Sequence, residues 1–155
     1  MNIETTTKQI ITVDYGKSLE EMIAAGNYDW VNGNITAKKF SIEGTGNVQY
    51  EPKVFHFDRY ISSEDAVAAI KADDRQNPWE PAKIEGLTAY GTKNPEEQRQ
   101  YPIIGLGSVA EVGGDRGVPG LGRSGARRSL GLYWWGGGWG GRCRFLAVRN
   151  LPSAT

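Results

Sequence analysis

Cysteine and histidine are almost missing from this chain of 155 residues, because each occurs once, as Cys143 and His56. A single cysteine excludes an internal disulfide, and this use of cysteine fits a reducing compartment. One histidine and one cysteine far apart in the sequence do not supply a structural zinc site. We therefore expect a cytoplasmic protein without a disulfide or a bound metal.

Long hydrophobic runs are also missing, since no apolar segment approaches the ~18 residues that span a bilayer. Residues 1–5 lack the basic and apolar regions of a signal peptide. The formal net charge is zero, so no overall field draws the chain to nucleic acid or to a membrane. The sequence thus predicts no membrane partner.

Charge is divided unevenly along what we expect to be one domain, residues 1–155. About residues 1–101 hold eleven basic and sixteen acidic residues, whereas about residues 102–150 hold seven arginines, no lysine and two acidic residues. The second part also holds fourteen of the 21 glycines and three of the five tryptophans. Packing of the two parts against each other would explain this division without any ligand.

The first part shows alternating and helical patterns. Residues 9–15 are β-branched and predict a strand. Ser18 and Glu21 form a capping box for a helix over 19–25. Residues 35–42 and 48–57 predict a β-hairpin. Ser62 or Ser63 is predicted to cap a second helix, and a third helix is predicted from Pro81 to about Tyr90.

The second part is harder to interpret because glycine interrupts it. Residues 102–109 predict a strand, and the glycine-rich residues 111–126 predict a loop. Residues 129–135 and 142–149 predict a second hairpin. Together the elements predict an α+β fold, a largely antiparallel sheet with two or three helices packed on one side.

Residues 120–125 spell GxGxxG, the fingerprint of a dinucleotide site. That site needs an apolar strand before the glycines, a helix after them and a later acidic residue for the ribose. Residues 113–119 are not such a strand in this interpretation, and no acidic residue follows Asp115. A chance match in a glycine-rich loop explains the motif better, and we expect no cofactor.

His56 is the one residue on which a hydrolytic centre of Ser-His-Asp or Cys-His type could be built. Asp58 shares its strand face and could hold it by a hydrogen bond. No spacing constrains a nucleophile, so a half-buried structural histidine is the simpler interpretation. The sequence does not identify an enzyme.

Arginine, aromatic rings and glycine meet in the predicted C-terminal hairpin, a composition that suits binding. Trp134 shares a face with Leu130 and Leu132 and is expected in the core. Trp135 lies on the opposite face and Trp139 in a glycine loop, so at least one of them is expected to face solvent and contact a ligand or partner. The arginines that could line the same surface are Arg127, Arg128, Arg142 and Arg144.

The whole chain, above all Tyr15–Ile23 and Trp134–Arg149, resembles small bacterial hypothetical proteins of no assigned function. Such proteins are often carried on mobile DNA, including integron gene cassettes. The resemblance implies a self-contained bacterial domain and supplies no catalytic residues.

Four functions follow from these patterns. The first is a non-enzymatic module that binds a protein, including a second copy of itself as a homodimer, through the aromatic and arginine hairpin. Single-stranded nucleic acid is the second, with arginines on phosphates and rings on bases. A small ligand in an aromatic pocket is the third, and a hydrolase centred on His56 is the fourth.

Overall fold

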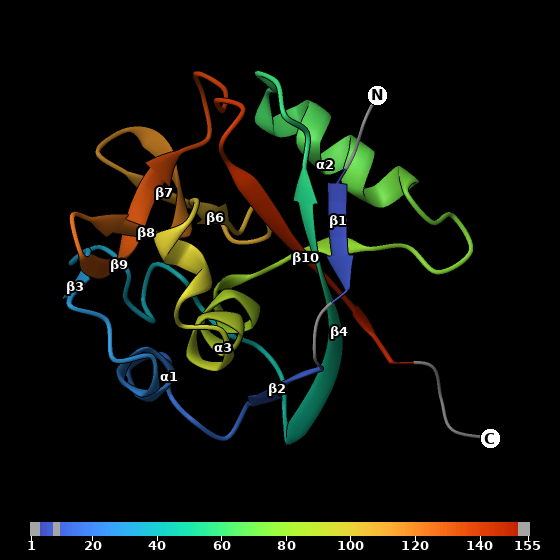
Figure 1. Cartoon of the computed structure of the whole chain (residues 1–155). Coiled ribbons are helices and arrows are strands. Elements are labelled where there is room, and N and C mark those ends of the chain that lie inside the picture. Colours follow the sequence, from blue (N-terminus) through green and yellow to red (C-terminus); the bar gives the residue numbers. More distant parts are fainter. Residues whose placement is uncertain (1–3, 8–9, 152–155) are drawn as a thin grey trace.

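Two long neighbouring strands, β4 (Asn47–His56) and β10 (Arg144–Asn150), lie at the centre of the fold (Figure 1). They pair antiparallel, with Phe145 opposite Phe55 and Leu146 opposite Val54. The structure is a computed structural model that describes residues 4–7 and 10–151.

The remaining strands extend this centre in both directions, in the order β1-β4-β10-β6-β8-β9-β3. Beside this path, β2 pairs with β4, β5 with β10 and β7 with β8. Only β10–β6 and β3–β9 are parallel among the pairs that join described strands. The bounds are β1 (Glu4–Thr7), β2 (Ile11–Asp14), β3 (Trp30–Val31), β5 (Glu80–Pro81), β6 (Ile103–Ile104), β7 (Ala110–Val112), β8 (Asp115–Ser124) and β9 (Arg127–Trp134).

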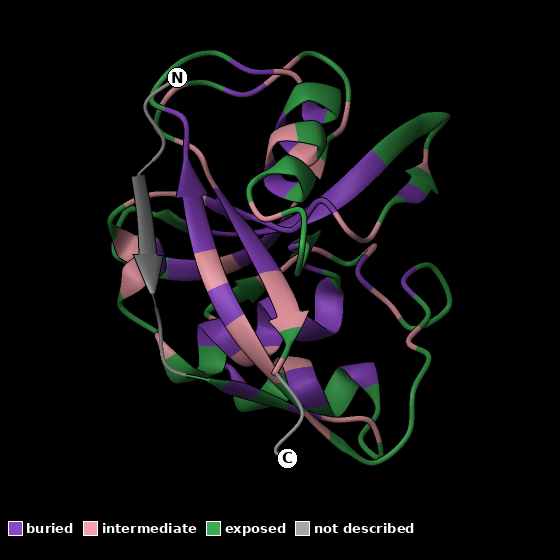
Figure 2. Ribbon diagram, turned by 90° about the vertical axis from the view of Figure 1, so that its right-hand side faces the viewer, coloured by how far each residue is buried: buried purple, intermediate pink, exposed green. Residues whose placement is uncertain are grey.

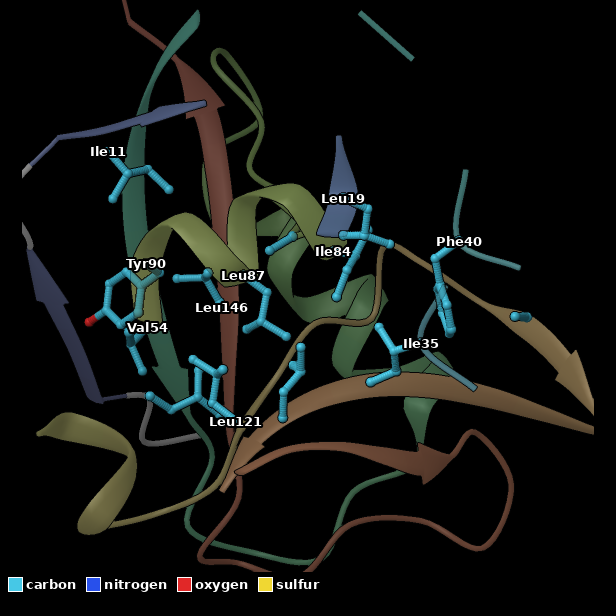
Figure 3. Close-up of a cluster of buried hydrophobic side chains, with 14 residues drawn as sticks. Ile11, Leu19, Ile35, Phe40, Val54, Ile84, Leu87, Tyr90, Leu121 and Leu146 are labelled. Atoms are coloured by element: carbon cyan, nitrogen blue, oxygen red, sulfur yellow. The ribbon is translucent and has the colours of Figure 1, made fainter. Parts of the chain in front are cut away.

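Both faces of the central strands are apolar, so the sheet is covered on both sides. Val54 and Leu146 point into a first cluster with α1 (Leu19–Ala25) and α3 (Ile84–Lys93), as Figure 3 shows. Phe55 and Phe145 point into a second cluster with α2 (Ser63–Ala72). Figure 2 shows buried residues concentrated on these strands. The predicted α+β class with two helices on one side is confirmed, and α2 lies on the other side.

The helix starts are set by local hydrogen bonds. The Glu21 amide donates to Ser18 Oγ at 3.1 Å and the Ser18 amide donates to Glu21 Oε1 at 2.9 Å, which confirms the capping box. Ser62 caps α2. The third helix begins at Ile84 rather than at Pro81, because Pro81 belongs to β5 and the Ile84 amide donates to Ser108 Oγ. A short 3-10 helix, η1 (Glu97–Arg99), follows α3.

Both predicted hairpins are wrong. Residues 35–42 form turns and irregular chain, and the partner of β4 near its start is β2. Residues 129–135 do not pair with 142–149, because β9 pairs with β8 while β10 lies between β4 and β6. The predicted strand over 102–109 is reduced to the two residues of β6.

The predicted loop over residues 111–126 is also wrong, because most of it forms β7 and β8. The ring of Tyr133 on β9 lies across the glycines of β8. A Cβ atom would lie 2.5 Å from Tyr133 Cε1 at Gly120 and 2.6 Å from the Tyr133 oxygen at Gly122. Gly125, with φ of +61°, makes the turn into β9. The GxGxxG residues thus form a strand and a turn with no helix after them.

Ion pairs join the acidic and the arginine-rich parts of the chain. Arg149 lies 3.1 Å from Glu51 and 3.0 Å from Asp74, and Arg116 lies 4.0 Å from Glu64. Some of the acidic residues of the first part therefore pair with arginines of the second part within the fold. Within the described ranges, no helix is long and apolar enough to cross a membrane.

A test of the glycine packing compares Gly120→Ala with Gly131→Ala. The first should lower the free energy of unfolding by about 1–3 kcal/mol, since its methyl group would overlap the Tyr133 ring and Ile104. The methyl group of Gly131→Ala would lie 3.4 Å from Tyr133 Cε1, so this variant should change the free energy of unfolding far less. Denaturant unfolding measures both, and equal effects would contradict the packing.

Candidate functional site

The six residues predicted to form one surface lie in separate places. Arg127 and Arg128 lie at the start of β9, while Trp135 follows its end. At about 3.4 Å per residue the two ends of β9 are roughly 24 Å apart. Trp139 and Arg142 lie in the loop before β10, and Arg144 is the first residue of β10. The missing hairpin is the reason that these residues are not assembled.

Arg128 is a structural residue, with 5% of its surface exposed. Its Nη1 donates to the Gly26 carbonyl at 2.7 Å and its Nε to the Pro95 carbonyl at 2.8 Å. Its Nη2 donates to Gln98 Oε1 at 3.0 Å, and its guanidinium lies 4.9 Å from the Tyr28 ring centre. These contacts use the group fully, so its assignment to a binding surface is corrected.

Trp139 is also a structural residue, with 5% exposed. Its Nε1 donates to Ser63 Oγ at 2.8 Å, and its ring lies 5.9 Å from Phe145 and 6.1 Å from Tyr133. Its backbone bridges to Ile61. The glycine loop was expected to offer little packing, but it folds onto the second cluster and buries this ring.

Trp134 is exposed instead, at 47%. Alternation placed it correctly on the face of Leu130 and Leu132, but β9 continues past the core and leaves the last ring outside. Trp134 borders a shallow hollow of about 380 Å³ together with Gly114, Asp115, Arg116 and Gly136. The prediction that Trp134 is a core residue is wrong.

Trp135 is half-buried on the opposite face from Trp134 and is linked to the hollow only through Arg116, which lines it. Its Nε1 donates to Glu64 Oε2 at 2.8 Å, and this hydrogen bond lowers the pKa of the Glu64 carboxyl. The Arg116 guanidinium lies 5.2 Å from the Trp135 ring centre. The Ser63 hydroxyl donates to the Trp135 carbonyl at 2.7 Å. Trp135 is therefore held in one orientation with part of its ring exposed.

Tyr60 contacts the loop that follows Trp135, with 66% exposed and its hydroxyl donating to the Gly137 carbonyl. We call the region the Trp134 surface. It combines the hollow with Trp134, Asp115 and Arg116 and, on the opposite face of the chain, Trp135 with Glu64, and Tyr60 beside the loop that follows. Sequence reasoning found only Trp135 there, and the missed signal was the tryptophan pair directly before a glycine run.

The other predicted arginines lie elsewhere. Arg127 is exposed, and its Nη2 lies 3.5 Å from the Asp29 carbonyl. Arg142 is exposed and donates to the Gln100 carbonyl at 3.2 Å. The Arg144 guanidinium lies 3.9 Å from the Tyr101 ring centre. None of these contacts involves a residue of the Trp134 surface.

His56 holds the loop before β10 against β4. Its Nε2 lies 2.7 Å from the Gly141 carbonyl and so carries the proton of that hydrogen bond. Asp58 Oδ1 lies 3.9 Å away. In this arrangement Nε2 is already used as a donor, which favours the structural interpretation. In the part of the chain that is described, no group of three or more His, Cys, Asp or Glu residues could hold a metal ion.

Comparisons with known proteins add no relative, because no family model, curated protein or solved structure matches this chain. Function is therefore inferred from the geometry of the chain alone.

Ser63→Ala tests the link between α2 and the glycine loop. We expect it to lower the free energy of unfolding by about 1–3 kcal/mol, because the buried Trp139 Nε1 would lose its acceptor. Trp139→Phe removes the donor as well, so the double variant should lose less than the sum of the single variants. Additive losses in denaturant unfolding would contradict the hydrogen bond.

Arg128→Lys tests the structural role of the buried guanidinium. Lysine lacks the fork that reaches Gly26, Pro95 and Gln98 together, so we expect a loss of about 2–4 kcal/mol of unfolding free energy. Arg127→Lys makes the same change at the exposed neighbour and should cost at most about 0.5 kcal/mol. Similar thermal and denaturant stability of the two variants would refute the assignment.

Proposed function

We propose that this chain is a non-enzymatic binding module that contacts a protein through the Trp134 surface, and that the partner is a second copy of the chain. The observation that carries the proposal is the ring of Trp134, 47% exposed at the hollow that it shares with Asp115 and Arg116. Tryptophan, tyrosine and arginine are the residues that most often dominate binding energy in protein interfaces.

The fixed geometry of this surface supports binding. Trp135 is held by Glu64 and by Ser63, and Tyr60 is held by the Gly137 carbonyl. Side chains that are already ordered lose little conformational entropy when a partner arrives. The hollow beside Trp134 would receive an apolar side chain or the edge of a ring.

The charges of the surface favour a second copy as the partner. Arg116 lies beside Asp115 in sequence and 4.0 Å from Glu64, so both signs occur within one small patch. An interface across a two-fold axis brings a patch against itself and requires such self-complementarity. A surface of one sign would instead repel its own copy.

A nucleic-acid ligand has less support. Stacking of bases needs several cations beside the rings, but Arg116 is the cation that lies over a ring of this surface. Arg128 is buried, and the contacts of Arg127, Arg142 and Arg144 lie elsewhere. The formal net charge of zero adds no attraction to phosphate.

The cellular location and the type of source organism stay predictions. The single cysteine supports a cytoplasmic location, and the resemblance of Tyr15–Ile23 and Trp134–Arg149 supports a small bacterial protein of the mobile-element type. Both proposals are independent of the partner.

Light scattering on a size-exclusion column tests the proposal. The unchanged chain should show twice the mass of one chain, at low and at high salt, because apolar burial is insensitive to screening. Trp134→Ala should weaken self-association at least tenfold, which corresponds to about 1.4 kcal/mol or more.

Trp30→Ala is the matched control, since Trp30 is 52% exposed but lies on β3 opposite Ser129, roughly 17 Å along β9 from Trp134. It should leave the dimer intact. A monomeric unchanged chain, or equal loss in both variants, would reject self-association through the Trp134 surface.

A further inference from the structure

Glu85 is a carboxylate inside the protein, with 5% of its surface exposed. It is the second residue of α3. Acidic side chains are almost never buried so deeply unless they are paired. The positive end of the helix dipole favours a negative charge in the first turn, which supports Glu85 at this place.

Two hydrogen-bonded tyrosines, Tyr15 and Tyr50, lie beside one carboxylate oxygen of Glu85. The Tyr15 hydroxyl donates to Glu85 Oε2 at 3.0 Å and lies 2.7 Å from the Tyr50 hydroxyl. Burial, then Tyr50 and Glu85, raise the pKa of Tyr15 well above its ordinary value, so Tyr15 keeps its proton and remains a donor. Among the described residues, no donor reaches Glu85 Oε1, and this oxygen is not one of the buried atoms without a partner, so it stays in contact with solvent.

Glu85 borders three hollows, and the one that also has Tyr15, Tyr50 and Val148 in its wall has a volume of about 230 Å³ and lies between the loop before β4, β5 and the start of α3. The polar residues around it are Tyr15, Glu43, Tyr50, Glu80, Lys83 and Glu85. Three carboxylates and one ammonium group thus line the hollow, and Glu80 also lies 3.9 Å from Lys71 Nζ. Pro81 and Val148 supply an apolar wall. The hollow is negative in balance and has room for a small group only.

Gly86 lines this hollow and has no side chain to fill it. A glycine inside a helix costs about 0.5–1 kcal/mol relative to alanine. An added Cβ would meet Val148 at 3.7 Å and Ala82 at 3.8 Å, which are ordinary contacts. No neighbour therefore requires glycine there, although a side chain at this position would occupy the wall of the hollow.

We propose that this hollow binds a small primary alkylammonium ion, with the ammonium group on Glu85 and the alkyl chain against Pro81 and Val148. A buried carboxylate with an unused oxygen forms a strong charge-assisted hydrogen bond to an ammonium group. Tyr15 and Tyr50 present rings that attract a cation. The site is separate from the Trp134 surface and does not depend on its function.

Calorimetric titration of the full chain with n-butylammonium tests the site, with n-butanol as the neutral probe of the same length. We expect n-butylammonium to bind and n-butanol to bind at least tenfold more weakly, because only the cation uses the carboxylate. Equal binding of the two probes, or no binding of n-butylammonium, would overturn the proposal.

Glu85→Gln keeps the shape of the side chain and an oxygen for the Tyr15 hydroxyl, so it should fold. We expect it to weaken n-butylammonium at least tenfold and to leave n-butanol unchanged. Glu96→Gln is the matched control, since Glu96 pairs with Arg99 on the surface and does not border the hollow. Equal weakening by both variants, or none by Glu85→Gln, would refute the role of Glu85.

Discussion

The buried guanidinium of Arg128 is the contact on which one half of the structure depends. It reaches carbonyls at the ends of α1 and α3, Gly26 and Gly91, and the Pro95 carbonyl before η1. Carbonyls at helix ends have no partner within their own helix, and the negative end of the helix dipole favours a cation. One side chain on β9 therefore satisfies both helix ends and fixes them against the sheet. The same contact sets the position of α3, whose first turn carries Glu85.

The other half depends on a hydroxyl group rather than a charge. Ser63, in the first turn of α2, donates to the Trp135 carbonyl and accepts from Trp139 Nε1. Trp139 thereby anchors the long glycine loop on the second cluster. Because the loop is anchored there, its first residues hold Trp135 against Glu64 and bring Gly137 to Tyr60. The exposed rings of the Trp134 surface are consequences of this packing and not of a flexible loop.

Sequence reasoning succeeded where the cause is local and failed where it is distant. The caps at Ser18 and Ser62 were predicted because their partners lie three residues away. Strand β8 was missed because the Tyr133 ring that replaces its side chains comes from another strand. The positions of Trp134 and Trp139 were reversed for the same reason, since burial of Trp139 depends on partners such as Phe145 and Ser63. Composition indicated which residue types form the Trp134 surface but not which residues lie there.

Some of the glycines and arginines that set the second part of the chain apart are explained by packing, as Gly120 and Arg128 show. What packing leaves unexplained is therefore the better guide to function. A large ring outside the core, Trp134, and a carboxylate inside it, Glu85, both depart from the rules that stabilise a fold. Natural proteins tend to break such rules at functional sites. The two departures lie on different elements, β9 and α3, so a protein surface and a small-ligand hollow can coexist in one chain without sharing a residue.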